Sequence, residues 1–119
     1  MPVAKRTEAP KTIAVQPNDI VSLTIIIGNA QIGSSTVKFK FTSAILGKGE
    51  IKDLVIGKGS DIAGKTLRIA TRVLDANPAS DKVSITHHFD NASPADTEYD
   101  DEIAEGQDVF TLLVDYALV

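Results

Sequence analysis

The sequence predicts an all-β fold, an antiparallel β-sandwich of about seven short strands, and three observations lead to that prediction. Apolar and polar residues alternate in several segments, as they do in half-buried strands. Residues that favour turns, namely Gly, Asn, Asp and Pro, separate these segments. Aromatic residues make up only 5% of the chain and Trp is absent, so the core must consist mainly of Ile, Val and Leu. The same pattern also allows a partly open β-barrel.

The clearest strand is predicted at Ile20 to Ile27. Successive side chains of a strand point to opposite sides, so every second residue can face the core. The predicted inward residues are Val21, Leu23, Ile25 and Ile27. A second strand is predicted at Thr36 to Phe41, after a break at Gly33-Ser34-Ser35. Its predicted inward residues are Val37, Phe39 and Phe41.

Further strands are predicted before, between and after these two. Short strands are expected at Thr12 to Gln16 and at Asp53 to Ile56, and longer ones at Lys82 to Phe89 and at the end of the chain. In the last two strands the predicted inward residues are Val83, Ile85, His87, Phe89, Phe110, Leu112, Val114, Tyr116 and Leu118. The length of 119 residues suits one hydrophobic core. We therefore expect a flexible N-terminal arm over residues 1–10 and a single β-sandwich domain over residues 11–119.

The segment from Lys65 to Asp75 has an ambiguous pattern. Its apolar residues fit one face of a helix and also alternate as in a strand. The following turn sequence, NPASD, and the neighbouring strands favour a strand that pairs with Lys82 to Phe89 as a hairpin. Strand is therefore the prediction here, and helix is the alternative.

The charge balance argues against nucleic acid as a partner. The formal net charge is −4, which repels a phosphate backbone. No apolar run approaches the roughly 18 residues of a membrane-spanning helix, so membrane insertion is not expected. Residues 1–17 lack the apolar stretch of a secretory signal. A soluble, cytoplasmic protein is the expectation, with export of a processed chain left open.

One segment matches the phosphate-binding loop pattern G-x-x-x-x-G-K-[ST]. It is the octapeptide GSDIAGKT, from Gly59 to Thr66. In that motif backbone N–H groups surround the phosphates, and the Lys and the hydroxyl bind phosphate and Mg²⁺. Such loops belong to βαβ units, whereas the chain before Gly59 is predicted to be antiparallel. A surface turn is therefore the favoured interpretation, and a nucleotide-binding enzyme that uses Lys65 and Thr66 is the less favoured one.

Two adjacent histidines, His87 and His88, raise the question of a metal or catalytic site. Consecutive strand residues face opposite sides, so the two rings cannot bind one ion. Zinc would need further ligands, and the chain has no Cys. We expect one half-buried and one exposed histidine, with no catalytic residues and no cofactor.

The polar, acidic segment from Asp90 to Gln107 is predicted to be a surface loop. Ca²⁺ takes six to eight oxygen ligands, and this segment is rich in carboxylates, although it lacks the EF-hand spacing. The candidate Ca²⁺ ligands are Asp96, Glu98, Asp100, Asp101 and Glu102, with Asp90 nearby. A solvated charged loop is the alternative interpretation.

The expected function follows from these features. No nucleophile motif such as G-x-S-x-G is present, and the terminal strand is strongly apolar. We therefore expect a non-catalytic module for protein interaction or self-assembly. The alternatives are a β-sandwich that binds Ca²⁺ or a small ligand and, less favoured, the nucleotide-binding enzyme.

Overall fold

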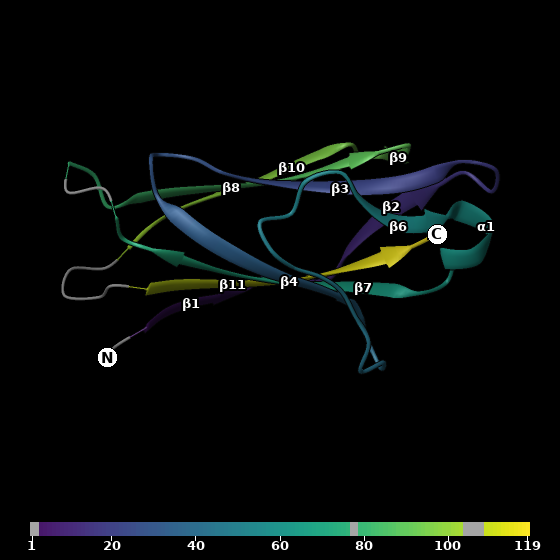
Figure 1. The fold of residues 1–119 in the computed structure, drawn as a ribbon, viewed down its shortest axis with the longest axis horizontal. Coiled ribbons are helices and arrows are strands. Elements are labelled where there is room, and N and C mark those ends of the chain that lie inside the picture. The colour runs from purple at the N-terminus through teal and green to yellow at the C-terminus, as the bar shows by residue number, and fades with distance from the viewer. Residues whose placement is uncertain (1–2, 77–78, 104–108) are drawn as a thin grey trace.

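The chain folds into two packed β-sheets that do not close into a barrel (Figure 1). The computed structural model describes residues 3–76, 79–103 and 109–119. Within these residues the larger sheet contains β1 (Val3–Thr7), β2 (Lys11–Val15), β4 (Ile32–Phe39), β5 (Ile45–Gly49), β7 (Thr66–Leu74), β9 (Ala92–Ser93) and β11 (Val109–Leu118). The smaller sheet contains β3 (Ile20–Ile27), β6 (Leu54–Lys58), β8 (Lys82–Asp90) and β10 (Asp96–Glu102). A four-residue helix, α1 (Gly59–Ile62), connects β6 to β7.

The strand order places β11 inside the larger sheet. That order is β5-β4-β7-β11-β2-β9, and the order in the smaller sheet is β10-β8-β3-β6. On one side β11 pairs with β7 in antiparallel fashion over nine residue pairs from Val109 to Ala117. On its other side it pairs in parallel with β1 and then with β2. The first and last parts of the chain therefore lie together in one sheet.

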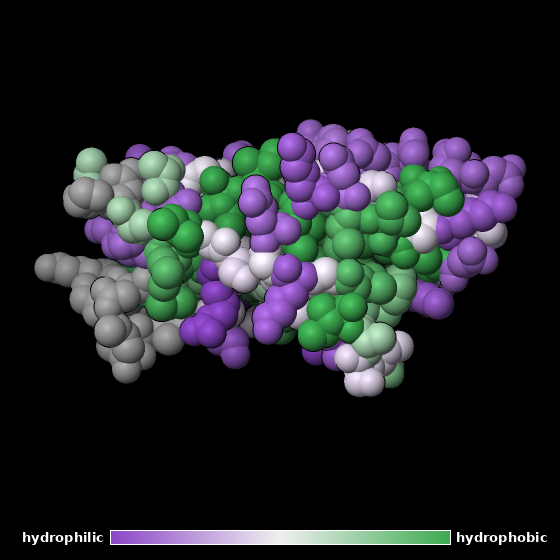
Figure 2. Space-filling model, viewed as in Figure 1, coloured by the Kyte–Doolittle hydropathy of each residue, from purple (hydrophilic) through white to green (hydrophobic). Residues whose placement is uncertain are grey.

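Alternating side chains of both sheets meet in a single hydrophobic core. Every second residue of β11 is buried, as the sequence predicted, and so is every second residue of β7 and β8. The fully buried aliphatic side chains include Ile13, Val21, Leu23, Val37, Leu67, Ile69, Ile85, Leu112 and Val114. Hydrophobic side chains also reach the surface between the sheets on the side of β4, β5 and β6, whereas many of the side chains along the top of this view, over the smaller sheet, are hydrophilic (Figure 2).

The predicted all-β sandwich is confirmed, and the segment from Lys65 to Asp75 is a strand, β7. The described residues contain eleven strands, where about seven were predicted. The four that the sequence pattern missed are β1, β5, β9 and β10. Three of these are short, and β10 is an edge strand whose outward residues are all charged. Apolar alternation is weak in such strands because little of their surface enters the core.

The predicted hairpin between Lys65 to Asp75 and Lys82 to Phe89 is wrong. β7 pairs with β4 and β11, whereas β8 pairs with β3 and β10 in the other sheet. The connection crosses between the layers beside the buried side chain of Gln31. Its Nε2 donates to the carbonyl oxygens of Ser80 and Lys82, and its Oε1 accepts from the backbone N–H of Ala76. These bonds satisfy the backbone where the chain leaves one sheet for the other.

The predicted acidic surface loop, Asp90 to Gln107, is also partly wrong. Asp96–Glu102 forms the edge strand β10 with Tyr99 pointing into the core, while residues 104–108 lie outside the described residues. At the N-terminus, where an arm outside the fold was predicted over residues 1–10, Val3–Thr7 forms β1 beside β11. Parallel pairing to β11 supplies hydrogen bonds that do not depend on an apolar pattern.

Strand β4 differs from the prediction at both ends. It begins at Ile32 and runs through Gly33-Ser34-Ser35, where a break was predicted. At its other end the strand stops at Phe39. Phe41, predicted to face the core, lies in the following turn with a φ of 70° and is 92% exposed. The left-handed backbone at Phe41 reverses the chain and turns its ring into solvent.

Adjacent isoleucines on β3 test the inward and outward assignment. Ile25 is 8% exposed and Ile26 is 54% exposed. We expect Ile25→Ala to lower the free energy of unfolding by about 3 kcal/mol because it leaves a cavity. Ile26→Ala, which loses the same strand propensity, should cost less than about 1 kcal/mol. Urea unfolding measures both values, and equal losses would contradict the register of β3.

Candidate functional site

The segment that resembles a phosphate-binding loop uses its backbone donors internally. The N–H groups of Gly59, Ser60 and Gly64 donate to the carbonyl oxygens of Asp19, Pro17 and Leu118. A Cβ on Gly59 would lie 1.8 Å from the Gln16 carbonyl oxygen, so Gly is required there by close backbone packing. A strand, β7, follows where the motif needs a helix. The geometry therefore fits a structural turn that seats α1 against the β2–β3 connection.

His87 lies in the core and His88 lies on the surface. The sequence predicted that the two rings face opposite sides, but His87 is fully buried rather than half-buried. The His87 Nδ1 and the Tyr116 hydroxyl are joined by a hydrogen bond of 2.6 Å, and the Tyr116 and Tyr99 hydroxyls are 3.1 Å apart. Burial lowers the pKa of His87 to about 4 and raises the pKa of Tyr116 above its ordinary value. His87 is therefore neutral at pH 7, and its Nε2 has no hydrogen-bond partner within the part of the chain that the structure describes.

His88 binds carboxylates through both ring nitrogens. Its Nδ1 contacts Asp96 and its Nε2 lies 3.0 Å from an Asp90 oxygen. The hydrogen bond to Asp96, followed by the one to Asp90, raises the pKa of His88. Because the two carboxylates lie at opposite sides of the ring, these three residues do not converge on one ion.

The candidate Ca²⁺ ligands lie along β10 and do not surround one point. Asp96, Glu98, Asp100 and Glu102 follow each other on its outward side, about 7 Å apart for every second residue. Asp101 faces the other way. Among the described residues, no group of three or more His, Cys, Asp or Glu side chains is arranged to hold a metal ion. The Ca²⁺ ligands remain a prediction, and the observed strand gives them no common centre.

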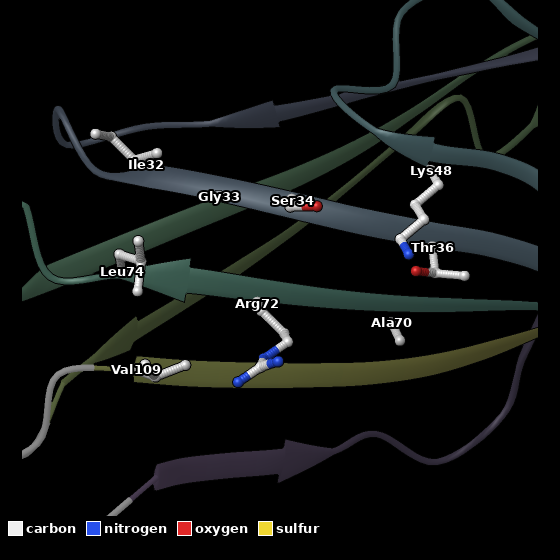
Figure 3. Close-up of a pocket in the computed structure, with 9 residues that line it drawn as sticks. All are labelled: Ile32, Gly33, Ser34, Thr36, Lys48, Ala70, Arg72, Leu74 and Val109. Carbon is white, nitrogen blue, oxygen red and sulfur yellow. The ribbon is translucent and has the colours of Figure 1, made fainter. Parts of the chain in front are cut away.

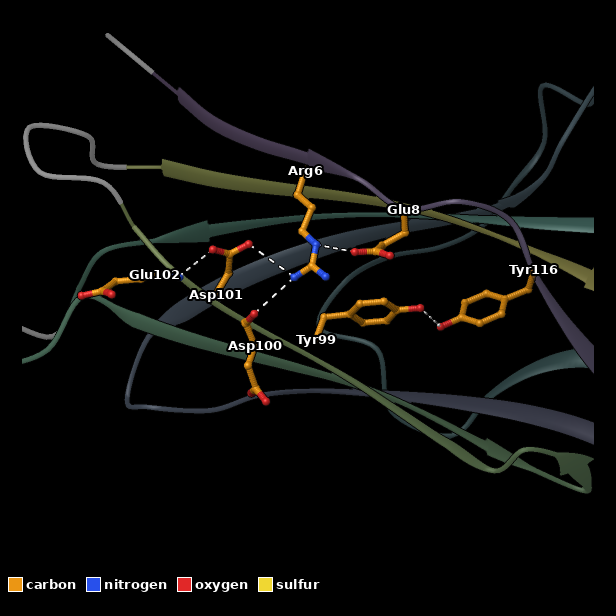
Figure 4. A network of polar contacts seen from close by, with 7 residues as sticks. All are labelled: Arg6, Glu8, Tyr99, Asp100, Asp101, Glu102 and Tyr116. Atoms are coloured by element: carbon orange, nitrogen blue, oxygen red, sulfur yellow. Dashed lines mark hydrogen bonds and ion pairs between the residues drawn. The ribbon is translucent and has the colours of Figure 1, made fainter.

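Arg6 of β1 connects the two sheets at the edge that carries β10 (Figure 4). One guanidinium nitrogen lies 3.3 Å from the Asp101 carboxylate and 3.2 Å from the Asp100 carbonyl oxygen, and the Arg6 Nε contacts Glu8. The guanidinium carbon lies 5.8 Å from the centre of the Tyr99 ring. The Arg6 side chain therefore joins β1 to β10 at the side of the sandwich where the hydroxyls of Tyr99 and Tyr116 are hydrogen-bonded.

The outer face of the larger sheet holds a groove of about 580 Å³ (Figure 3). We call it the sheet groove. Strands β4, β5, β7 and β11 supply its lining residues, which are Ile32, Gly33, Ser34, Thr36, Lys48, Ala70, Arg72, Leu74 and Val109. Except for Gly33, which alternates with Ile32 and Ser34, these are outward residues of their strands, because the alternate set faces the core.

An apolar row crosses one end of the sheet groove. Ile32, Leu74 and Val109 are register partners on β4, β7 and β11, and Figure 3 shows them in line. Ile32 is 61% exposed and Leu74 is 52% exposed. The next outward row contains Ser34 and Arg72, and the one after it contains Thr36 and Lys48. Apolar and cationic side chains therefore lie side by side in one depression.

The outer face around the sheet groove is strongly basic. Its outward positions, with the turn after β4, hold the cations Lys5, Lys38, Lys40, Lys48, Arg68 and Arg72 and the carboxylate Asp115. Asp115 accepts two hydrogen bonds from Arg68, at 2.9 and 3.0 Å, and lies 3.6 Å from the Lys40 Nζ. The hydrogen bonds from Arg68 hold the pKa of Asp115 below its usual value.

Arg72 and Lys48 have a different environment from Arg68. No carboxylate of residues 3–76, 79–103 or 109–119 lies within ion-pair distance of either side chain. Both are exposed and line the sheet groove next to the hydroxyls of Ser34 and Thr36. This arrangement can bind anionic groups.

Comparison with known proteins leaves the surface chemistry as the guide to function. No protein-family model matches the chain, and no significant match exists among curated proteins or among solved structures. Within the described residues, no helix has the length and apolar character needed to cross a membrane.

The sequence pattern did not point to the sheet groove. Gly33 and Ser34 lay in a predicted break, and Lys48 lay in none of the predicted strands. Arg72 could be placed on the polar side of its segment, but its neighbours on β4 and β11 depend on strand order. The exposure of Phe41, the most exposed aromatic residue described, was not predicted, because Phe41 continues the apolar alternation of β4 in the sequence.

The burial of His87 gives stability a definite pH dependence. Its pKa is about 4 in the folded state and 6.5 in the unfolded state, so the unfolded chain binds the proton first. The free energy of unfolding should therefore be fully retained above pH 6.5 and should fall by about 3 kcal/mol on acidification to pH 4. Urea unfolding at pH 4 to 8 measures this fall.

The variant His87→Phe should lose this part of the acid destabilisation, while carboxylate contributions stay common to both proteins. His88→Gln is the control, because protonation of His88 is favoured in the folded state and acts in the opposite direction. An unchanged pH profile in His87→Phe would show that His87 does not titrate as its burial requires.

Proposed function

We propose that this protein is a non-catalytic interaction module that binds an acidic, extended protein segment in the sheet groove. One observation carries the proposal: the apolar row of Ile32, Leu74 and Val109 adjoins Arg72 and Lys48, two cations with no ion pair to any described residue. The described residues contain no arrangement of nucleophile, base and oxyanion donors in that groove, and its lining suits binding.

The apolar row supports a protein partner rather than a free inorganic anion. Exposed aliphatic side chains that lie together gain free energy when a partner removes them from water, at about 25 cal/mol per Å². An inorganic anion can form ion pairs with Arg72 and Lys48, but it leaves Ile32 and Leu74 exposed to water. A polypeptide can cover both, because it carries apolar and charged side chains at close spacing.

The sign of the charge supports an acidic partner. Six cations and one carboxylate occupy the outer face of the larger sheet in the described residues, although the chain as a whole has a formal net charge of −4. A local field of this kind favours negative partners and disfavours positive ones. The flat, pleated surface also fits an extended segment whose side chains repeat about every 7 Å.

An eight-residue peptide of alternating Glu and Thr, labelled with fluorescein, tests the proposal by fluorescence anisotropy. We expect it to bind the protein at low ionic strength and to be released as salt screens the charges. The double variant Arg72→Glu/Lys48→Glu should weaken binding at least about tenfold, since attraction becomes repulsion at two contacts.

The matched control is Lys52→Glu/Lys65→Glu, which makes the same change in net charge at two exposed residues outside the sheet groove. It should bind the peptide more tightly than the groove variant does. A peptide of alternating Lys and Thr should not bind. If the two double variants weaken binding equally, the sheet groove is not the binding surface.

A further inference from the structure

We infer that the acidic segment that occupies the sheet groove is strand β10 of a second copy of this chain, so that the protein assembles head to tail. The inference rests on the proposed function and names its partner. It starts from the different charges of the two outer faces, although the outward side of the smaller sheet also holds Lys82, beside Glu102. The larger sheet carries the cations described above, and the smaller sheet carries an acidic row at its edge.

The acidic row lies on the outward side of β10. Asp96, Glu98, Asp100 and Glu102 alternate there with Thr97, Tyr99 and Asp101, which point the other way. Asp96 is engaged by His88, and Glu98 accepts a hydrogen bond from the Ser84 hydroxyl. Within the described residues, neither Glu98 nor Asp100 has a cationic partner for its carboxylate. Both carboxylates are exposed at the free edge of the smaller sheet.

The spacing of the two sets of charges matches along the strand direction. Glu98 and Asp100 are two residues apart on β10, which corresponds to about 7 Å. Arg72 and Lys48 lie in successive outward rows of the larger sheet, which are separated by the same two-residue step. β4 lies between β5 and β7, so the two cations are also about 10 Å apart across the strands. A β10 strand that crosses the sheet groove obliquely can present one carboxylate to each cation, because the long side chains of Arg72 and Lys48 can reach toward it.

Apolar contacts are available beside these charges. On the smaller sheet, Ile26, Thr86 and Glu98 are register partners on β3, β8 and β10. Ile26 is 54% exposed, so the acidic face carries an apolar side chain in the same row as Glu98. On the larger sheet, Ile32 and Leu74 lie one row from Arg72. The two faces are thus complementary in apolar character as well as in charge.

The positions of the faces determine the kind of assembly. They lie on opposite sides of the sandwich, in a molecule that measures 46 × 24 × 22 Å (Figure 1). A contact between opposite faces uses a different surface on each partner, and each added copy leaves one of each face free. An outer face of about 46 by 22 Å offers on the order of 1,000 Å², enough for a standard interface of roughly 800 Å² per partner.

Two complementary variants test this assembly. Arg72→Glu/Lys48→Glu, the groove variant, removes the receiving face and keeps β10. Glu98→Lys/Asp100→Lys, the strand variant, removes the acidic row and keeps the sheet groove. Circular dichroism first verifies that both variants fold. Sedimentation velocity and light scattering then follow each protein, and their mixture, over a range of concentrations at low and high salt.

The wild-type protein is expected to grow beyond a dimer as its concentration rises at low ionic strength, and to dissociate in high salt. Each variant alone should remain a monomer. An equimolar mixture should form a dimer that does not grow, because it contains one intact groove and one intact β10. The control Lys52→Glu/Lys65→Glu should still assemble.

Other outcomes overturn the inference. A strand variant that still dimerises alone indicates a symmetric contact through another surface. If Phe41→Ser abolishes assembly and neither charge variant affects it, the contact lies at the β4–β5 turn.

Two further outcomes separate the inference from the proposed function. If the wild-type protein stays monomeric but binds the Glu-Thr peptide, self-assembly is wrong and the proposed function stands. If the chain assembles through β10 but the groove variant binds the peptide as tightly as the wild-type protein does, the peptide binds at another surface. The proposed function is then wrong.

Discussion

The structure depends most on the burial of one face of β11. The inward residues of that strand, Phe110, Leu112, Val114, Tyr116 and Leu118, are at most 4% exposed. Full burial of a large apolar side chain contributes roughly 1.5–3 kcal/mol, and here five of them point into the same interior. Because β11 also pairs on both sides, it connects β7 to β1 and β2 and joins distant parts of the chain.

The polar groups of the core follow from the same arrangement. Tyr116 lies on the buried face of β11, so its hydroxyl needs a partner inside the sandwich. His87 and Tyr99, from β8 and β10 of the other sheet, provide the partners. The guanidinium of Arg6, on β1, lies against the Tyr99 ring at this edge of the sandwich. A continuous set of contacts therefore runs from the protonatable His87 ring in the core to charged residues at the surface.

The two outer faces differ because the two sheets have different edges and different outward residues. The larger sheet presents cations and an apolar row, whereas the smaller sheet presents an acidic edge strand. Charged residues on an edge normally discourage pairing with other strands through backbone hydrogen bonds. On β10 the carboxylates of Glu98 and Asp100 stay exposed, and side-chain contacts of this kind are what the proposed head-to-tail assembly uses.

Sequence reasoning reached some parts of the candidate site and missed others for a physical reason. Glu98 and Asp100 were recognised as clustered carboxylates, but as metal ligands in a loop, because Tyr99 alone gave little sign of a strand. Arg72 lay within the predicted strand from Lys65 to Asp75. Its position next to Ile32 and Lys48 depends on the pairing of β4 with β5 and β7, which links residues far apart in the chain and leaves no local pattern.

The sequence by itself determined the strand character of most segments and the face that each one buries. It did so because the two-residue alternation of Ile, Val and Leu is a local property, set by which side of a strand must leave water. Only the tertiary structure decided which strands are neighbours, that β7 and β8 lie in different sheets, and that residues near the N-terminus pair with β11. Those choices depend on how complete faces pack together and on where backbone hydrogen bonds find partners, and neither is encoded within a single segment.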